Sequence, residues 1–252
     1  MKPVRSLIGT LFAIVLLLPL ASHGADFSIS PVRISFAAQQ KADIIMVKNF
    51  KDTPVSLQLS VMAWTQDDDA GDVTVPTEDI IAFPKLLTIK GGEEQMIRIG
   101  KRTTAGEVEK TYRIFIEELP GKDVDPAVTG PVIRTLTRVG IPIFVLPLKE
   151  QPSMAIDRVQ LSGGQLALTV RNDGNTHFVT REVRVTGHDQ DGKPIFQHDI
   201  AGWYLLSGHE KRYQIEVPRD VCLQLRQLDM EVVTDNSSRS ERIDVTPEMC
   251  SP

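Results

Sequence analysis

The stretch PVSLQLSVMAW, residues 54–64, alternates aliphatic side chains with side chains of other kinds at a period of two. Successive side chains of a β-strand point to opposite faces, so this stretch predicts a strand with one face on a hydrophobic core. The positions predicted to face that core are all aliphatic: Val55, Leu57, Leu59, Val61 and Ala63.

The same period recurs along most of the chain. Polar turn signals such as DDDAGD (67–72) and NDGN (172–175) separate the strand candidates, and hardly any segment has helical spacing. Short strands joined by polar turns favour β-sandwiches over an α/β enzyme. The further strand candidates are ADFSISPVRISF (25–36), ADIIMVKNF (42–50), LLTIKGGEEQMIRIG (86–100), TYRIFIEELP (111–120), QLALTVRN (165–172), VTREVRVTGHD (179–189), KRYQIEVP (211–218) and LDMEVVTD (228–235).

The segment PLKEQPSM, 147–154, suggests a domain boundary, because two prolines and two charges follow one strand series and precede another. It predicts an N-terminal domain over 25–148 and a C-terminal domain over 149–252. Each has the size of an immunoglobulin-like sandwich.

The first 24 residues have the pattern of a cleaved signal peptide. Lys2 and Arg5 precede the apolar run Leu7–Leu20, and small residues follow it. The alternative, a membrane anchor, is weaker because 14 residues of helix reach about 21 Å, short of a hydrocarbon core of about 30 Å. No later stretch is long and apolar enough to span a bilayer, so we expect an exported chain without a membrane span.

The charge balance argues against binding to nucleic acid. The chain carries 28 basic and 33 acidic side chains, a net charge of −5, and loss of Lys2 and Arg5 with the signal peptide makes it −7.

In an oxidising compartment the simplest expectation for Cys222 and Cys250 is one disulfide between them. Two unpaired thiols are the alternative.

No motif indicates an enzyme, a cofactor or a metal centre. The sequence has no GxSxG elbow, phosphate-binding loop or dinucleotide fingerprint, and its histidines lack zinc-site spacing. The aspartate cluster 67–72 could hold a calcium ion, but it lacks the spacing of an EF-hand loop. A surface turn is the expected role of that cluster.

Three arginines interrupt otherwise apolar strand patterns: Arg33, Arg98 and Arg113. A charged guanidinium is costly to bury without a partner, so each is expected to face solvent or to pair with a local acid such as Glu117. Two or three of them converging in a cleft would instead form a receptor for a carboxylate, because the guanidinium fork matches carboxylate geometry.

The stretch TLTRVGIPIFVLP, 135–147, has an apolar face but carries Pro142 in its middle. Proline has no N–H to donate to a ladder, so this strand is expected at a sheet edge or a bulge. Edge strands with an apolar face are usually hidden, which raises the question of what this edge serves.

An ordered series of stretches resembles the N-terminal domain of the PapD-like periplasmic chaperones of the chaperone–usher pathway. The series is PVRISF (31–36), KNFKDTPVSLQLSVMAW (48–64), DIIAFPKLLTIKGGEEQMIRIG (79–100), TYRIFIEELP (111–120) and VGIPIFVLP (139–147). The resemblance implies two immunoglobulin-like domains set at an angle with a cleft between them. It also implies a non-enzymatic function in the periplasm.

The resemblance explains the edge strand. Chaperones of this family lend the last strand of their first domain to a pilus subunit whose own sandwich lacks a strand. The edge and its apolar face would therefore be exposed as a working surface. By parity the donating face would comprise Ile133, Thr135, Thr137, Val139, Ile141 and Ile143.

The carboxylate anchor departs from the best-known branch of the family. Arg33 matches that branch's arginine in the first strand, but the lysine expected five residues before Pro147 is replaced by Pro142. The pattern therefore resembles the archaic or alternative branch, with Arg113 as the candidate that would bind the C-terminal carboxylate of a subunit.

The resemblance implies pilus subunits and an outer-membrane usher as partners, with self-association of the free protein as a further possibility. Two other functions stay open: a pilus structural subunit or adhesin, and an exported β-sandwich enzyme or sugar-binding module. A subunit would normally be one incomplete sandwich, and a sugar-binding module usually displays more aromatic residues than the 6% found here.

Overall fold

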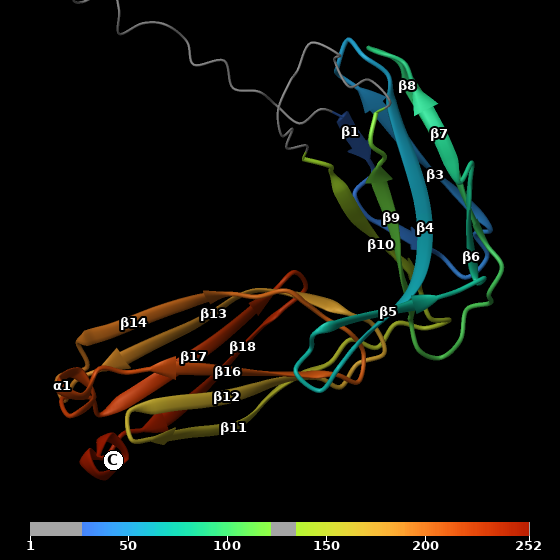
Figure 1. Ribbon diagram of the computed structural model, residues 1–252. Coiled ribbons are helices and arrows are strands. Elements are labelled where there is room, and N and C mark those ends of the chain that lie inside the picture. Colours follow the sequence, from blue (N-terminus) through green and yellow to red (C-terminus); the bar gives the residue numbers. More distant parts are fainter. Residues whose placement is uncertain (1–26, 122–134, 252) are drawn as a thin grey trace, which may run out of the picture.

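The computed structural model describes residues 27–121 and 135–251 of the chain. These residues form two β-sandwiches set at an angle to each other (Figure 1). The N-terminal sandwich contains β1 to β10, and the C-terminal sandwich contains β11 to β18 with two short helices, α1 and η2. The all-β fold predicted from the period of two is therefore confirmed.

The N-terminal sandwich consists of two facing sheets. One sheet has the strand order β1-β3-β8-β6, and the other has the order β2-β10-β9-β4-β5, with β7 also paired to β4. The bounds are β1 (Phe27–Ser30), β2 (Ile34–Phe36), β3 (Ala42–Asn49), β4 (Val55–Gln66), β5 (Asp72–Pro76), β6 (Ile80–Phe83), β7 (Leu86–Ile89), β8 (Glu94–Lys101), β9 (Lys110–Glu118) and β10 (Arg138–Val145).

Alternation along these strands builds the core of the N-terminal sandwich. Ile45 and Ile97 from the first sheet and Ile114 from the second are fully buried in one apolar cluster. The predicted inward positions of the 54–64 stretch belong to it or pack against it. Because inward and outward residues alternate, the other face of the six-stranded sheet is free to carry the polar and aromatic groups described below.

The C-terminal sandwich has sheets of order β11-β12-β16 and β14-β13-β17-β18, with β15 paired to β13. The predicted disulfide Cys222–Cys250 is present and links α1 to η2. The bounds are β11 (Met154–Ser162), β12 (Gln165–Asn172), β13 (Phe178–His188), β14 (Pro194–Ala201), β15 (Tyr204–Leu205), β16 (Glu210–Glu216), α1 (Arg219–Cys222), β17 (Gln227–Thr234), β18 (Ser238–Asp244) and η2 (Pro247–Cys250).

The connection between the sandwiches runs from the end of β10 at Val145 to the start of β11 at Met154. The boundary expected after residue 148 falls within this connection and stays a prediction. The expected signal peptide, residues 1–24, lies outside the described residues. Within 27–121 and 135–251 no helix is long and apolar enough to cross a membrane.

A small aromatic cluster joins the two sandwiches. Trp64 and Phe144, from the outward face of the six-stranded sheet, pack with Leu206 and Tyr204 of the C-terminal sandwich. Gln66 reinforces the contact: its Nε2 donates to the carbonyl of Tyr204 at 2.8 Å, and its Oε1 accepts from the N–H of Leu206 at 2.9 Å. The outward face of this sheet therefore faces the second sandwich.

Candidate functional site: the strand β10 and two flanking arginines

The strand β10 has two different neighbours along its length. On one side it pairs antiparallel with β9 over all eight residues, Arg138–Val145. On the other side it pairs in parallel with β2, but only over Ile143–Val145. Over 138–142 no strand of the described part of the chain pairs with that second edge. A strand edge without such a partner can accept an added strand.

The side chains of β10 are less available than its backbone. Ile141 and Ile143 are 1% and 0% exposed and belong to the core of the N-terminal sandwich. The expectation that the whole odd-numbered face is exposed is therefore wrong at these two positions, because the opposite sheet covers them. Val139 is half-buried, whereas Thr135 and Thr137 are exposed; Ile133 lies outside the described residues.

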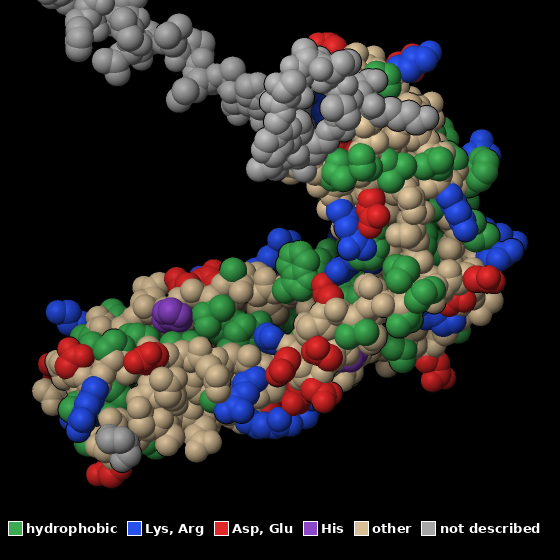
Figure 2. Space-filling model, viewed as in Figure 1, with side chains coloured by type: hydrophobic (Ala, Val, Ile, Leu, Met, Phe, Trp, Pro, Cys, Tyr) green, Lys and Arg blue, Asp and Glu red, His purple; other side chains and the backbone are tan. Residues whose placement is uncertain are grey.

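Arg113 lies on β9, on the outward face of the six-stranded sheet. It pairs in register with Pro142 of β10 and with Met62 of β4. Its guanidinium carbon lies 3.9 Å from the centroid of the Trp64 ring, a cation–π contact. Since Trp64 packs on the second sandwich, Arg113 lies beside the inner angle of the molecule, where Figure 2 shows basic side chains next to acidic ones in a hollow.

The acid that pairs with Arg113 is Asp72, at the start of β5. Arg113 Nη1 donates to Asp72 Oδ2 at 2.7 Å, while Trp64 Nε1 donates to Asp72 Oδ1 at 2.9 Å. The expected local partner, Glu117, pairs instead with Arg138, whose guanidinium lies over the ring of Phe115. Asp72 was missed because its turn position gives no signal that it faces β9.

The other two arginines take different positions. Arg33 is exposed and immediately precedes Ile34, the residue of β2 that pairs with Ile143, so it stands where the open edge of β10 begins. Arg98 is exposed on β8, in the opposite sheet. Arg33 and Arg113 therefore flank β10, and Arg98 does not join them.

The absence of a side chain at Gly140 leaves space for the side chain of Arg113 on the sheet. A Cβ at this position of β10 would lie 3.0 Å from Arg113 Cδ and 3.1 Å from Phe115 Cε1. Both side chains cross the strand where the glycine leaves room. The signal was present in the quoted stretch 135–147, since a glycine inside a strand often marks a close approach of a neighbour.

Residues 26–150 match the model of a protein family, the pili and flagellar-assembly chaperones, PapD N-terminal domain. The chain belongs to the PapD-like chaperone family. No curated protein sequence matches the chain.

Solved structures of PapD-like chaperones resemble the whole two-sandwich fold. In the pre-assembly complex of chaperone CsuC with tip adhesion subunit CsuE, from archaic Csu pili of Acinetobacter baumannii, the match has a TM-score of 0.57 and 21% identity, covering 87% of this chain and 98% of that one. The Salmonella enterica complex of pilin SafA with chaperone SafB matches with a TM-score of 0.55 and 15% identity, covering 89% of this chain and 99% of that one. The E. coli chaperone DraB matches with a TM-score of 0.52 and 14% identity, covering 87% of this chain and 95% of that one.

A buried polar contact at the junction of this PapD-like fold was also missed. Glu109, whose side chain is 0% exposed, accepts from the N–H of His177 at 2.9 Å and lies 2.8 Å from its Nδ1. The ring of His177 stacks on Phe144 at 3.7 Å between centroids. These residues come from different domains, so a period of two could not place them together.

The aspartate cluster 67–72 forms a turn. Asp67 Oδ1 accepts from the N–H groups of Asp69 and Gly71 at 3.0 and 2.7 Å, as turn aspartates commonly do. Across 27–121 and 135–251 no group of three or more His, Cys, Asp or Glu side chains is placed to hold a metal ion.

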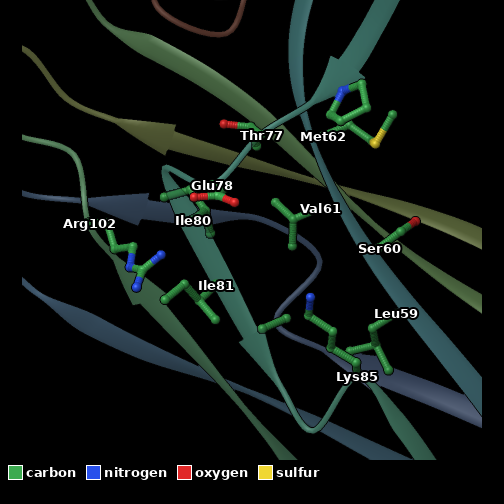
Figure 3. Close-up of a pocket in the computed structure, with 12 residues that line it drawn as sticks. Leu59, Ser60, Val61, Met62, Thr77, Glu78, Ile80, Ile81, Lys85 and Arg102 are labelled. Carbon is green, nitrogen blue, oxygen red and sulfur yellow. The ribbon is translucent and has the colours of Figure 1, made fainter.

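A groove of about 500 Å³ lies on the far edge of β4, away from β10. Figure 3 shows apolar side chains of β4 and β6, among them Val61 and Ile80, beside the charged groups of Glu78, Lys85 and Arg102. The groove opens where β4 passes from its pairing with β7 to its pairing with β5. Neither Arg33 nor Arg113 lines it.

Proposed function

We propose that this protein binds and caps pilus subunits by lending them the strand β10, and that it delivers them to an outer-membrane usher. The single observation that carries the proposal is the edge of Arg138–Pro142 with which no strand of residues 27–121 or 135–251 pairs, bordered by β2 at one end and by β9 along the other side. An incoming strand could continue the sheet there without displacing any strand of the described chain.

The donating side chains would lie at the start of β10 and in the segment just before it. We assign Ile133, Thr135, Thr137 and Val139 to contacts with the subunit. Ile141 and Ile143 would stay in the core that already holds them, because their withdrawal would open the N-terminal sandwich. In this proposal the C-terminal end of β10 stays in the core of the chaperone, and its N-terminal end contacts the subunit.

Arg113 and Arg33 would bind the C-terminal carboxylate of the subunit. They stand on either side of β10, so a carboxylate held between them would align the subunit strand with the open edge. Such an anchor fixes register, because a slip of one residue would turn every side chain to the wrong face. The absence of a lysine at Pro142 supports a place in the archaic branch, and CsuC is a chaperone of archaic pili.

The site of action would be the periplasm, reached with the signal peptide 1–24, and the activity would be binding rather than catalysis. The complexes of CsuC with CsuE and of SafB with SafA are chaperones bound to subunits, which supports pilins as the partner class. We keep self-association through the open edge as a property of the free protein to be measured.

Co-expression with a pilin subunit tests the function. We expect a soluble one-to-one complex that survives gel filtration and leaves the pilin folded, as measured by light scattering and circular dichroism. A pilin that aggregates equally with and without the chaperone would contradict the proposal. Light scattering of the free protein also gives its oligomeric state.

A further inference from the structure

Asp72 uses both carboxylate oxygens to occupy the proposed anchor, Arg113, and its neighbour Trp64. One oxygen accepts from Arg113 and the other from the indole N–H of Trp64, at 2.7 and 2.9 Å. The indole ring in turn covers the guanidinium. In the free protein Arg113 therefore already has a carboxylate partner.

The remaining sides of Arg113 are also occupied. Gly140 lies against its Cδ, and the side chain of Arg113 is only 13% exposed. A second carboxylate could join the site only by bringing a like charge against Asp72 at a partly buried ion pair, which is unfavourable. If the incoming carboxylate instead displaces the Asp72 carboxylate from Arg113, the repulsion is avoided and the guanidinium stays paired.

We propose that Asp72 is an internal substitute for the subunit carboxylate: it occupies Arg113 in the free chaperone and is displaced when a subunit binds. The proposal rests on the function proposed above, and it adds a residue that sets the affinity of the anchor. A guanidinium whose positive charge is already balanced by Asp72 attracts other anions weakly, so the site favours a ligand that also pairs with β10.

The position of Asp72 allows this exchange. It is the first residue of β5, an edge strand, and its side chain is 28% exposed. The turn before it is held by the second sandwich, where Lys211 Nζ donates to the carbonyl of Asp69 at 2.5 Å and Ala70 packs against the C-terminal core. The backbone can therefore stay in place while the side chain rotates away.

The substitution Asp72→Asn tests the exchange, because it keeps an oxygen for Trp64 and removes the charge that pairs with Arg113. The probe is N-acetyl-alanyl-alanine as its free acid and as its amide, titrated while the indole N–H resonance of Trp64 is followed by NMR. We expect the variant to bind the acid at least tenfold more tightly than the unmodified protein does. We expect no gain for the amide.

Two further variants complete the test. Asp72→Ala should show the same gain for the acid, which covers the case in which the asparagine variant folds poorly. Glu117→Gln is the matched control, since Glu117 pairs with Arg138 over the ring of Phe115 in the same sheet, and it should leave affinity unchanged.

Unchanged or weaker acid binding by both Asp72 variants, including no binding at all, would overturn the proposal and make Asp72 a positioning residue. An equal gain for the amide would overturn it too. The outcome is separable from the proposed function: failure of the unmodified protein to capture any pilin refutes the function, whereas pilin capture without a gain in acid affinity refutes the exchange alone.

Discussion

The guanidinium carbon of Arg113 lies 3.9 Å from the centroid of the Trp64 ring, and Asp72 accepts a hydrogen bond from each of the two residues. The contact joins the middle of β9 to the aromatic cluster between the sandwiches. It places a permanent positive charge on β9, beside the edge of β10 that is paired, across the strand from the edge that no described strand covers.

Replacing Arg113, the proposed anchor, should separate binding from folding. For Arg113→Ala we expect loss of pilin capture, with a decrease in the free energy of unfolding of only about 1–2 kcal/mol, because one cation–π contact and one partly exposed ion pair are lost. Co-purification and denaturant unfolding measure the two effects. Arg98→Ala, on the opposite sheet, is the control, and a normal yield of complex from Arg113→Ala would remove the residue from the mechanism.

Filling the space at Gly140 should displace the side chain of Arg113, the proposed anchor, without removing it. In Gly140→Ala the new methyl group would contact Arg113 and Phe115 at about 3 Å, so both side chains must shift. We expect weaker pilin capture and a small loss of stability, measured by gel filtration and thermal unfolding. Gly100→Ala places its methyl group in open space and should change neither quantity.

The parity of the donated segment can be tested on exposed residues. Thr135→Asp should reduce pilin capture more than Leu136→Asp does, because in a strand that continues β10 the two side chains would point to opposite faces and only the odd face would enter the subunit. Equal losses would show that the parity is wrong. Ile141→Asp gives no comparable test, since a charge in the core would unfold the N-terminal sandwich.

Removal of the disulfide should weaken the C-terminal sandwich. The pair Cys222 and Cys250 is separated by 28 residues, so the double alanine variant should lose about 3–4 kcal/mol in the chain-entropy model. Differential scanning calorimetry should show a transition at lower temperature for this sandwich. A scan identical to that of the unmodified protein would contradict the estimate.

Alkaline pH should destabilise the N-terminal sandwich through Tyr112. Burial, followed by the hydrogen bond to Asp79 at 2.7 Å, raises the pKa of the Tyr112 hydroxyl well above its usual value of about 10. Above pH 10 the unfolded chain loses this proton while the folded chain keeps it, so stability falls as pH rises toward the folded pKa.

The slope of this decline gives the measurement. It should reach at most about 1.4 kcal/mol per pH unit from this group. Tyr112→Phe should be less stable at neutral pH and should show a shallower decline above pH 10 in urea unfolding. An unchanged slope would mean that Tyr112 does not titrate on unfolding.

The sequence predicts strands best where one face is buried. Alternation located β4, β9 and β12 because each has a core side and an outer side. It missed β14 and β18, which lie at sheet edges and whose side chains are mostly exposed or half-buried. An edge strand without a buried face lacks the signal that alternation provides.

The site was predictable in its residue types but not in its pairings. Arg113 stood out as a charge in an apolar strand, yet Asp72 lies 41 residues away and meets it only through the path of β4 and β5. The burial of Ile141 was also hidden, because alternation says that a face is covered without saying which molecule covers it. Contacts between sheets and between domains require the tertiary fold.

The short reach of β2 along β10 bears on how a guest protein leaves. Because Ile143–Val145 already pair with β2 and β9 of the same chain, the N-terminal sandwich of the chaperone keeps its own strand pairing before, during and after a subunit is bound. Release of the subunit would then need no refolding of the chaperone, and each chaperone molecule could serve many rounds of assembly.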